Sequence, residues 1–296
     1  MLFIRNNYRG ILAVAAIVLL FLLIIPSALA EPDTVNDSIA VLPGLSHEDA
    51  GKKEVLQKVG NYRILVIDAW DYSEEEITAL KKQGCEVYSY INVGSLETWR
   101  PWYKNYQSLC LLPYEGWEDE SWVNVTGFSW QEHCVNLADY YLERGIDGFF
   151  LDNVDVTEEL EENAGFERGN AEDAVTAIIS GIRSLNDSHI PVIINGGTAY
   201  LDYEIGKGNP FACDGICLES VYTEVTDYES DGSKAAPDAD VRKKTAMLNG
   251  YIEKGIMVWD IEYTKNRLLA QDIRRKAARN GWSLYIASSY ALDRPE

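Results

Sequence analysis

Short apolar runs recur along the chain, separated by stretches of helical length. Each run has the length of a buried β-strand, and the intervening stretches place apolar residues on one face of a helix. This alternation predicts a parallel sheet wrapped by helices. The eight predicted strands cover residues 39–42, 63–68, 86–92, 148–152, 191–195, 215–219, 256–262 and 283–287.

Helices are expected between most of these strands. The clearest start is at Ser73, because Glu76 stands at the spacing of a capping box. Several predicted helices end in a glycine just before the next strand, which supplies the left-handed residue that stops a helix. The predicted helices cover residues 48–58, 73–83, 131–144, 171–185, 239–254 and 265–280, and the stop glycines are Gly84, Gly145, Gly255 and Gly281.

Eight strands with intervening helices fit either an open doubly wound sheet or a closed barrel, and periodicity alone does not choose between them. The position of the polar residues favours the barrel, because the active sites of (β/α)8 barrels form at the carboxyl ends of the strands. Any single acidic strand end could be a helix cap, but six polar ends indicate a shared pocket. These ends are Asp68, Asn92, Asp152, Asn195, Glu219 and Glu262.

We therefore predict an α/β fold, a (β/α)8 TIM barrel that lacks a regular last helix. The chain ends soon after the last strand, so the helix expected over residues 48–58 could cover the place that a final helix would fill.

Two carboxylates stand out within that set. Side chains alternate along a strand, so Asp152 shares a face with Phe150, and Glu219 shares one with Cys217. If those faces line the barrel interior, the two carboxylates meet at its rim. Glycoside hydrolysis needs such a pair, one group to protonate the leaving oxygen and one to act as nucleophile or base. Paired acids also bind metals or cap helices, so residue type alone does not decide.

The sequence resembles the endo-α-1,4-polygalactosaminidase family of glycoside hydrolases. The similarity runs in order from about Tyr62 to Arg294 and rests on Ile67-Asp68, Tyr90-Ile91-Asn92-Val93-Gly94, Trp99-Arg100, the segment from Gly145 to Asp155, Asn195-Gly196, Glu219-Ser220 and Ala291-Leu292-Asp293. The resemblance implies a (β/α)8 barrel that cleaves α-1,4-linked galactosamine-containing polymers. It also implies catalysis by Asp152 and Glu219, and favours a retaining mechanism with Asp152 as nucleophile and Glu219 as acid/base.

Around this pair we expect a substrate-binding set of aromatic and polar residues. Aromatic rings at strand ends can stack on sugars, although most aromatic residues of a chain this rich in them serve the core. Polar groups could hold sugar hydroxyls or an ammonium group. The candidates are Asp68, Trp70, Tyr90, Asn92, Arg100, Asn153, Asp155, Asn195, Tyr222, Trp259, Glu262 and Tyr263. An alternative for two of them is a structural ion pair between Arg100 and Asp155.

The first 30 residues have the layout of a secretory signal peptide. Arg5 and Arg9 precede an apolar run over residues 11–25, and small residues follow up to Ala30. We expect cleavage after Ala30, with an uncleaved membrane anchor as the alternative. Residues 31–46 are interpreted as a tether leading into the first strand, and residues 47–296 as the barrel domain. The protein is therefore expected to be secreted or extracytoplasmic.

The charge balance of the chain limits which classes of partner it can bind. Asp and Glu number 47 against 26 Lys and Arg, giving a formal net charge of −21, which argues against a nucleic-acid partner. A polysaccharide substrate is expected, either neutral or a cationic amino-sugar polymer, and we expect a monomer that contacts membranes only through an uncleaved leader. No cofactor and no catalytic metal are predicted, because the three histidines are scattered and none stands beside a cysteine pair.

Five cysteines are too few for a disulfide scaffold. Cys110 and Cys134 flank one long connection and are the expected bridge. The other three are interpreted as buried small apolar residues.

Two functions remain open at this point. The first is a secreted endo-acting glycosidase, acting on an amino-sugar polymer or on another envelope polysaccharide. The second is a catalytically silent barrel that binds polysaccharide. A binding module needs no proton donor opposite a second carboxylate, so the presence of both acids favours the enzyme.

Overall fold

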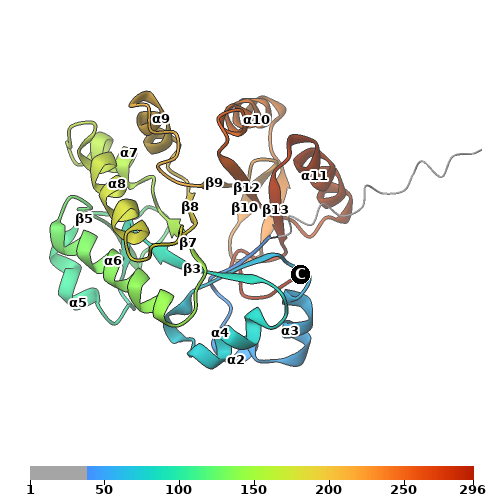
Figure 1. Cartoon of the computed structure of the whole chain (residues 1–296). Helices are drawn as coiled ribbons and strands as arrows, with labels where there is room; N and C mark the ends of the chain where they lie inside the picture. The colour runs from blue at the N-terminus through green and yellow to red at the C-terminus, as the bar shows by residue number, and fades with distance from the viewer. Residues whose placement is uncertain (1–38) are drawn as a thin grey trace, which may run out of the picture. The chain divides into compact units, whose positions relative to one another are not determined.

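A computed structural model describes residues 39–296 of the chain. Eight parallel strands in the order β1-β2-β3-β7-β8-β9-β12-β13 form a nearly closed barrel with helices around it (Figure 1). The predicted (β/α)8 TIM barrel is therefore confirmed. Its strands are β1 (Ile39–Leu42), β2 (Ile64–Ile67), β3 (Glu86–Asn92), β7 (Gly148–Asp152), β8 (Val192–Asn195), β9 (Gly215–Glu219), β12 (Met257–Tyr263) and β13 (Ser283–Ala287).

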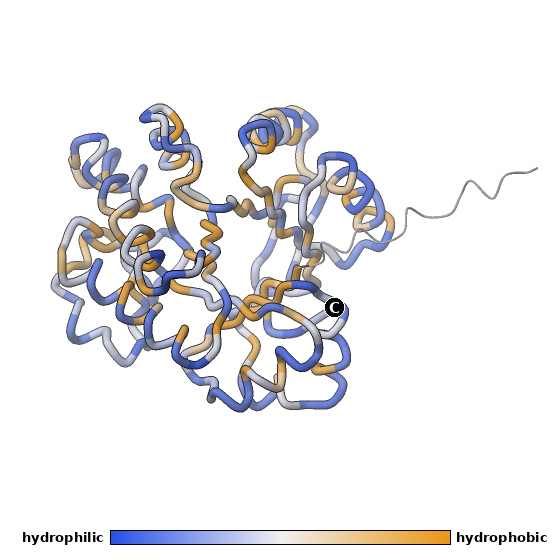
Figure 2. The backbone as a smooth tube through the Cα atoms, viewed as in Figure 1, coloured by the Kyte–Doolittle hydropathy of each residue, from blue (hydrophilic) through white to orange (hydrophobic). Residues whose placement is uncertain are grey.

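The strands are the most apolar part of the chain, as expected for a parallel sheet covered on both faces. Every residue of β1, β2 and β8 is buried. Figure 2 shows hydrophobic backbone along the central strands and hydrophilic backbone on the outer parts of the helices. Burial of these runs against one another and against the helices supplies the main driving force for the fold.

The helices occur close to where the sequence places them. The capping box at Ser73 is present, with Glu76 bonded back to the Ser73 backbone. The glycines expected to stop helices, at 84, 145, 255 and 281, all have positive φ. The helices are α2 (His47–Ala50), α3 (Lys53–Val59), α4 (Glu74–Lys81), α5 (Tyr103–Tyr106), α6 (Phe128–Glu143), α7 (Val156–Asn163), α8 (Asn170–Arg183), α9 (Thr198–Gly206), α10 (Asp238–Ile252) and α11 (Arg267–Asn280).

One expected helix is interrupted. The helix predicted over residues 48–58 is divided into α2 and α3, because Lys52 has an extended backbone with φ −69° and ψ 136°. Three further helices, α5, α7 and α9, were not predicted. The four-residue α5 is too short to show helical periodicity. The helices α7 and α9 each begin within a few residues of a strand end, where the sequence resembles the rest of the strand-end motif.

Two small sheets leave the barrel at the carboxyl ends of strands. A three-stranded antiparallel sheet follows β3 and has the order β4-β6-β5, and a two-stranded hairpin of β10 and β11 follows β9. Both were missed because their strands are short and mostly half-exposed or exposed. Their bounds are β4 (Ser95–Glu97), β5 (Cys110–Pro113), β6 (Glu120–Val123), β10 (Thr223–Asp227) and β11 (Gly232–Ala235).

No regular helix follows β13 within residues 39–296, and the segment after β13 bonds to the loop after β1. The Gly44 N–H donates to the Leu292 carbonyl at 3.2 Å. An added Cβ at Gly44 would lie 2.1 Å from the Ala291 carbonyl oxygen, so only glycine allows this approach. The C-terminal segment thereby joins the loop after β1 to the loop after β13.

The expected disulfide between Cys110 and Cys134 is wrong. All five cysteines are free, with Cys110 on β5 and Cys134 on the buried face of α6. Burial raises the pKa of the Cys134 thiol, which keeps it protonated and unreactive.

The predicted signal peptide lies outside residues 39–296. Within that range, no helix combines the length and apolar character needed to cross a membrane.

Candidate active site

The side chain of Asn195, at the end of β8, lies between two carboxylates. Its Nδ2 donates to Asp152 Oδ1 and to Glu219 Oε1, each at 2.8 Å. Because β8 lies between β7 and β9 in the sheet, one amide can reach the acids at both neighbouring strand ends. The two bonded oxygens are therefore no further apart than twice 2.8 Å.

The parity argument from the sequence agrees with this arrangement. In the register, Asn92 pairs with Asp152, and Asn195 pairs with Cys217. The same face of the barrel wall carries Phe150 and Trp259, whose rings lie 6.2 Å apart across the interior. The acids therefore stand above an aromatic interior that excludes water.

This environment changes the acidity of Asp152. Burial, and then the negative charge of Glu219, raise its pKa to about 7. Hydrogen bonds from Asn195, the Asn153 N–H and Tyr90 oppose the rise without cancelling it. Two carboxylates this close cannot both ionise easily, so a substantial fraction of Asp152 is protonated near neutral pH.

Glu219 has a second donor. The Tyr263 hydroxyl at the end of β12 donates to Glu219 Oε2. Burial and the adjacent carboxylate raise the pKa of Tyr263 well above its usual value, so the phenol keeps its proton. Asn195 and Tyr263 together fix the orientation of the Glu219 carboxylate.

The backbone immediately after each acid is unusual. Asn153 and Ser220, which follow Asp152 and Glu219, have φ of 61° and 55°. Residues other than glycine rarely adopt positive φ, and such conformations cluster at functional sites. Both strands therefore turn sharply directly after the carboxylate.

Asn153 connects the pair to the small sheet after β3. Its Nδ2 donates to Asn92 Oδ1 and to Ser95 Oγ, both at 3.1 Å, and its Oδ1 accepts from the Tyr114 hydroxyl at 3.0 Å. Ser95 Oγ in turn donates to Glu120 at 2.6 Å. This polar network positions the backbone that carries Asp152.

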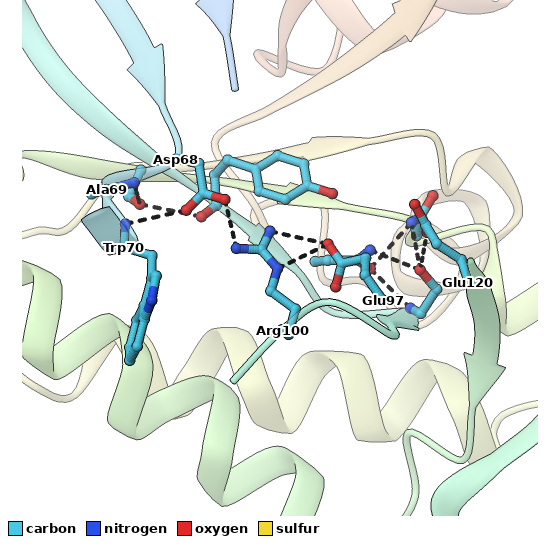
Figure 3. Close-up of polar contacts among 11 residues, drawn as sticks. Asp68, Ala69, Trp70, Glu97, Arg100 and Glu120 are labelled. Atoms are coloured by element: carbon cyan, nitrogen blue, oxygen red, sulfur yellow. Dashed lines mark hydrogen bonds and ion pairs between the residues drawn. The ribbon is translucent and has the colours of Figure 1, made fainter. Parts of the chain in front are cut away.

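A second polar cluster lies beside the pair and contains Arg100. Figure 3 shows Arg100 between Asp68 and Glu97, with bonds of 2.6 Å to Asp68 and 3.0 and 3.2 Å to Glu97. Asp68 also accepts from the Trp70 N–H at 3.2 Å. Arg100 thus ties two carboxylates together, and the cluster is a structural support for the β3 rim.

The alternative ion pair between Arg100 and Asp155 does not form. Asp155 instead accepts from the Gly197 N–H at 2.7 Å, while Arg100 bonds to Asp68 and Glu97. The sequence could not show this, because Glu97 lies in the unpredicted strand β4.

Four other candidates lie away from the carboxylate pair. Glu262 is completely buried on the helix-facing side of β12 and accepts from the Tyr222 N–H and the Thr223 hydroxyl. Tyr222 packs against Trp282 in the helix layer, and Trp259 is buried in the barrel interior. Trp70 likewise packs against Trp102 and Tyr140. The observed partners of these four side chains lie away from the carboxylate pair.

The structure thus brings together one group of candidates around the pair. Each member bonds directly to Asp152 or Glu219, or to a residue that does. Sequence reasoning missed several residues of the β4-β6-β5 sheet and its turn that bond to this group or to Arg100. The signal that could have found them is the length of the connection between β3 and α6, because long connections in compact domains are usually functional. The group consists of Asp152, Glu219, Asn195, Asn153, Asn92, Tyr90 and Tyr263; the missed partners are Ser95, Glu97, Tyr114 and Glu120.

Comparisons with known proteins show the family and the fold. The sequence profile of glycoside-hydrolase family GH114 matches residues 41–294. An uncharacterized protein of Methanocaldococcus jannaschii is 24% identical over 251 residues, covering 77% of this chain and 70% of that protein.

Two solved structures share the fold at low identity. The glycoside hydrolase domain of PelA from Pseudomonas aeruginosa has a TM-score of 0.69 and 18% identity, covering 86% of this chain and 96% of that one. Ega3 from Aspergillus fumigatus, in complex with galactosamine, has a TM-score of 0.65 and 16% identity, covering 87% and 92%.

Replacing Asp152 tests its electrostatic environment. Asp152 ionises near pH 4 in the unfolded chain but only near pH 7 in the folded protein. Its presence therefore lowers the free energy of unfolding by an amount that is absent below about pH 4 and grows until about pH 7. Asp152→Asn should therefore melt above the wild type at pH 8, by on the order of 5 °C, and the difference should shrink at pH 4. An exposed control, Asp187→Asn, should melt with the wild type at both pH values. A difference for Asp152→Asn that does not change with pH would contradict the raised pKa.

Replacing Gly94 tests the close approach behind Asn153. An added Cβ at Gly94 would lie 1.8 Å from the Asn153 carbonyl oxygen. Gly94→Ala should lower the melting temperature by roughly 5 °C or more, because backbone cannot move as a flexible side chain can. The matched control is Gly250→Ala in α10, where an added Cβ meets nothing within 4 Å. Equal melting temperatures for the two variants would show that the approach does not constrain the site.

Proposed function

The chain belongs to glycoside-hydrolase family GH114, and from this we propose that it is a secreted endo-acting hydrolase of an α-1,4-linked galactosamine-containing polysaccharide. It acts through Asp152 and Glu219. One observation carries the proposal: a single amide bonds both carboxylates, so the two acids needed for hydrolysis stand close together at the barrel rim.

The spacing of the acids favours a retaining mechanism. Retaining glycosidases hold their carboxyl groups about 5–5.5 Å apart, whereas inverting enzymes leave about 6.5–9.5 Å for a water molecule. A separation of at most twice 2.8 Å between the bonded oxygens agrees with the shorter class. Asp152 then attacks the anomeric carbon while Glu219 protonates the leaving oxygen, and Glu219 later activates water to release the sugar.

The protonation of the pair sets a condition on this mechanism. Asp152 must be ionised to attack, and its pKa is raised to about 7. A positive charge on the bound sugar would lower its pKa and so favour the ionised, nucleophilic form. An amino sugar carries such a charge, and an ammonium group near Asp152 would favour the ionised form that attacks the anomeric carbon.

Substrate class is supported by charge and by similarity. The net charge of −21 favours attraction of a cationic polymer. Ega3, which shares the fold, is described in complex with galactosamine. The leader-like segment supports action outside the cell.

Isosteric replacement of each acid tests the assignment. Asp152→Asn and Glu219→Gln should each lower hydrolysis of partly deacetylated galactosaminoglycan at pH 8 by about 100- to 10,000-fold, because each removes a carboxylate while preserving its shape. The Glu219→Gln variant should recover part of its rate on an activated substrate whose leaving group needs no proton, and Asp152→Asn should not. New reducing ends report the rate, with a panel of other polymers alongside.

The control is the exposed Asp187→Asn variant, which should turn over at the wild-type rate. Near-normal hydrolysis by a folded Asp152→Asn or Glu219→Gln protein would mean that the catalytic acids lie elsewhere. Cleavage of a different polymer alone would leave the acids in place and change the substrate.

A further inference from the structure

Two loop tips meet across the mouth of the barrel. Trp117 lies in the turn between β5 and β6, and Tyr228 in the turn between β10 and β11. Their ring centroids are 6.2 Å apart at an interplanar angle of 65°. The β4-β6-β5 sheet follows β3, and β3 lies next to β7, the strand that carries Asp152. The β10-β11 hairpin follows β9, the strand that carries Glu219. The contact between Trp117 and Tyr228 therefore joins the two small sheets that flank the strands carrying Asp152 and Glu219.

Each of the two small sheets is held in place by contacts close to one of the two carboxylates, Asp152 or Glu219. On the first side, Trp117 N–H donates to the Tyr114 carbonyl at 3.1 Å, and the Tyr114 hydroxyl donates to Asn153, the residue after Asp152. The Tyr114 ring also packs 4.2 Å from Trp122. The small sheet is thus held in place relative to the Asp152 strand.

On the second side, aromatic rings lead from the tip to the other acid. Tyr228 packs against Tyr290 at 5.1 Å, and Tyr290 against Tyr263 at 4.4 Å. Tyr263 donates to Glu219. The hairpin is also tied down by Asp231, which accepts from Tyr290 N–H and pairs with Lys265. Aromatic side chains therefore follow one another from Glu219 out to the rim.

The tips differ from the bases in exposure. Trp117 remains 51% exposed and Tyr228 61% exposed, although the rings touch, whereas Tyr263 is buried. Large exposed aromatic rings beside a site are suited to stacking on flat apolar faces of a ligand. Exposed acidic residues lie within two positions of each ring in the sequence, namely Glu115, Glu118 and Glu229, so the tips combine aromatic faces with negative charge.

We propose that Trp117 and Tyr228 form an aromatic clasp that holds a polysaccharide chain at sugar units beyond those that contact Asp152 and Glu219. The proposal rests on the proposed function for the class of ligand. The ring faces of the clasp stack on sugar rings, and the surrounding acids favour sugars that carry a free amine. A chain too short to reach the clasp gains nothing from it, so the clasp makes turnover depend on chain length.

Comparison of long and short substrates tests the clasp. Trp117→Ala and Tyr228→Ala should each raise KM for the polymer by roughly 5- to 10-fold, the change expected for one lost aromatic contact. The kcat/KM on a short activated glycoside should stay within about twofold of the wild type. Trp117→Phe, which keeps a ring, should stay near the wild type on both. The double alanine variant should lose little more than either single one, because the two rings act as one unit.

The matched control is Phe211→Ala, which removes an aromatic side chain that is 63% exposed and precedes the amino end of β9, at the opposite end of the barrel. It should leave both substrates unaffected. Equal losses on long and short substrates, or no loss on the polymer, would overturn the clasp.

Binding without turnover separates this proposal from the proposed function. The Glu219→Gln protein, with and without Trp117→Ala, is run through gels that contain galactosamine-containing, glucosamine-containing or neutral polysaccharides. Retardation that weakens when Trp117 is replaced supports the clasp. If the wild type binds but cleaves none of these polymers, the proposed function is contradicted and the clasp is not. Retardation that is unchanged by Trp117→Ala, or absent with every polymer, would overturn the clasp.

Discussion

The bridge from Asn195 to Asp152 and Glu219 is the interaction on which the rest of the site depends. Two carboxylates in a buried setting repel each other, and burial together with the charge of Glu219 raises the pKa of Asp152. One amide can offset it only because β8 lies between β7 and β9, so that three consecutive strand ends converge. The barrel therefore does more than display the acids: its strand order places the compensating donor between them.

The surrounding structure keeps this arrangement rigid. Tyr263 fixes Glu219 from β12, and Asn153 ties the Asp152 strand end to the small sheet after β3. The left-handed backbone at Asn153 and Ser220 turns each chain away from the acid just above it. Preorganised donors of this kind cost no reorganisation during reaction, which is how polar sites stabilise developing charge. The two small sheets after β3 and β9 extend this network of contacts from Asp152 and Glu219 to the rim of the barrel.

Much of this fold was accessible from the sequence, because strands buried on both faces are continuous apolar runs and their polar ends mark the rim. Alternation also placed Asp152 and Glu219 on defined faces. Glu262 shows the limit of that reasoning: it stands next to Tyr263 in the chain, yet the two point to opposite sides of β12, and only tertiary packing decides which side is the interior. The partners of Arg100 were equally inaccessible, since Glu97 lies in a short strand without apolar periodicity.

The stereochemistry of hydrolysis tests the central claim most directly, because it follows from how far apart Asp152 and Glu219 are held. The anomeric configuration of the first-formed product can be followed by proton NMR before it mutarotates, with a defined α-1,4-linked galactosamine oligomer as substrate. Two acids bridged by one amide predict retention, so the α-anomer should appear first. Initial formation of the β-anomer would show inversion, and would contradict an active site in which these two carboxylates stand one amide apart during catalysis.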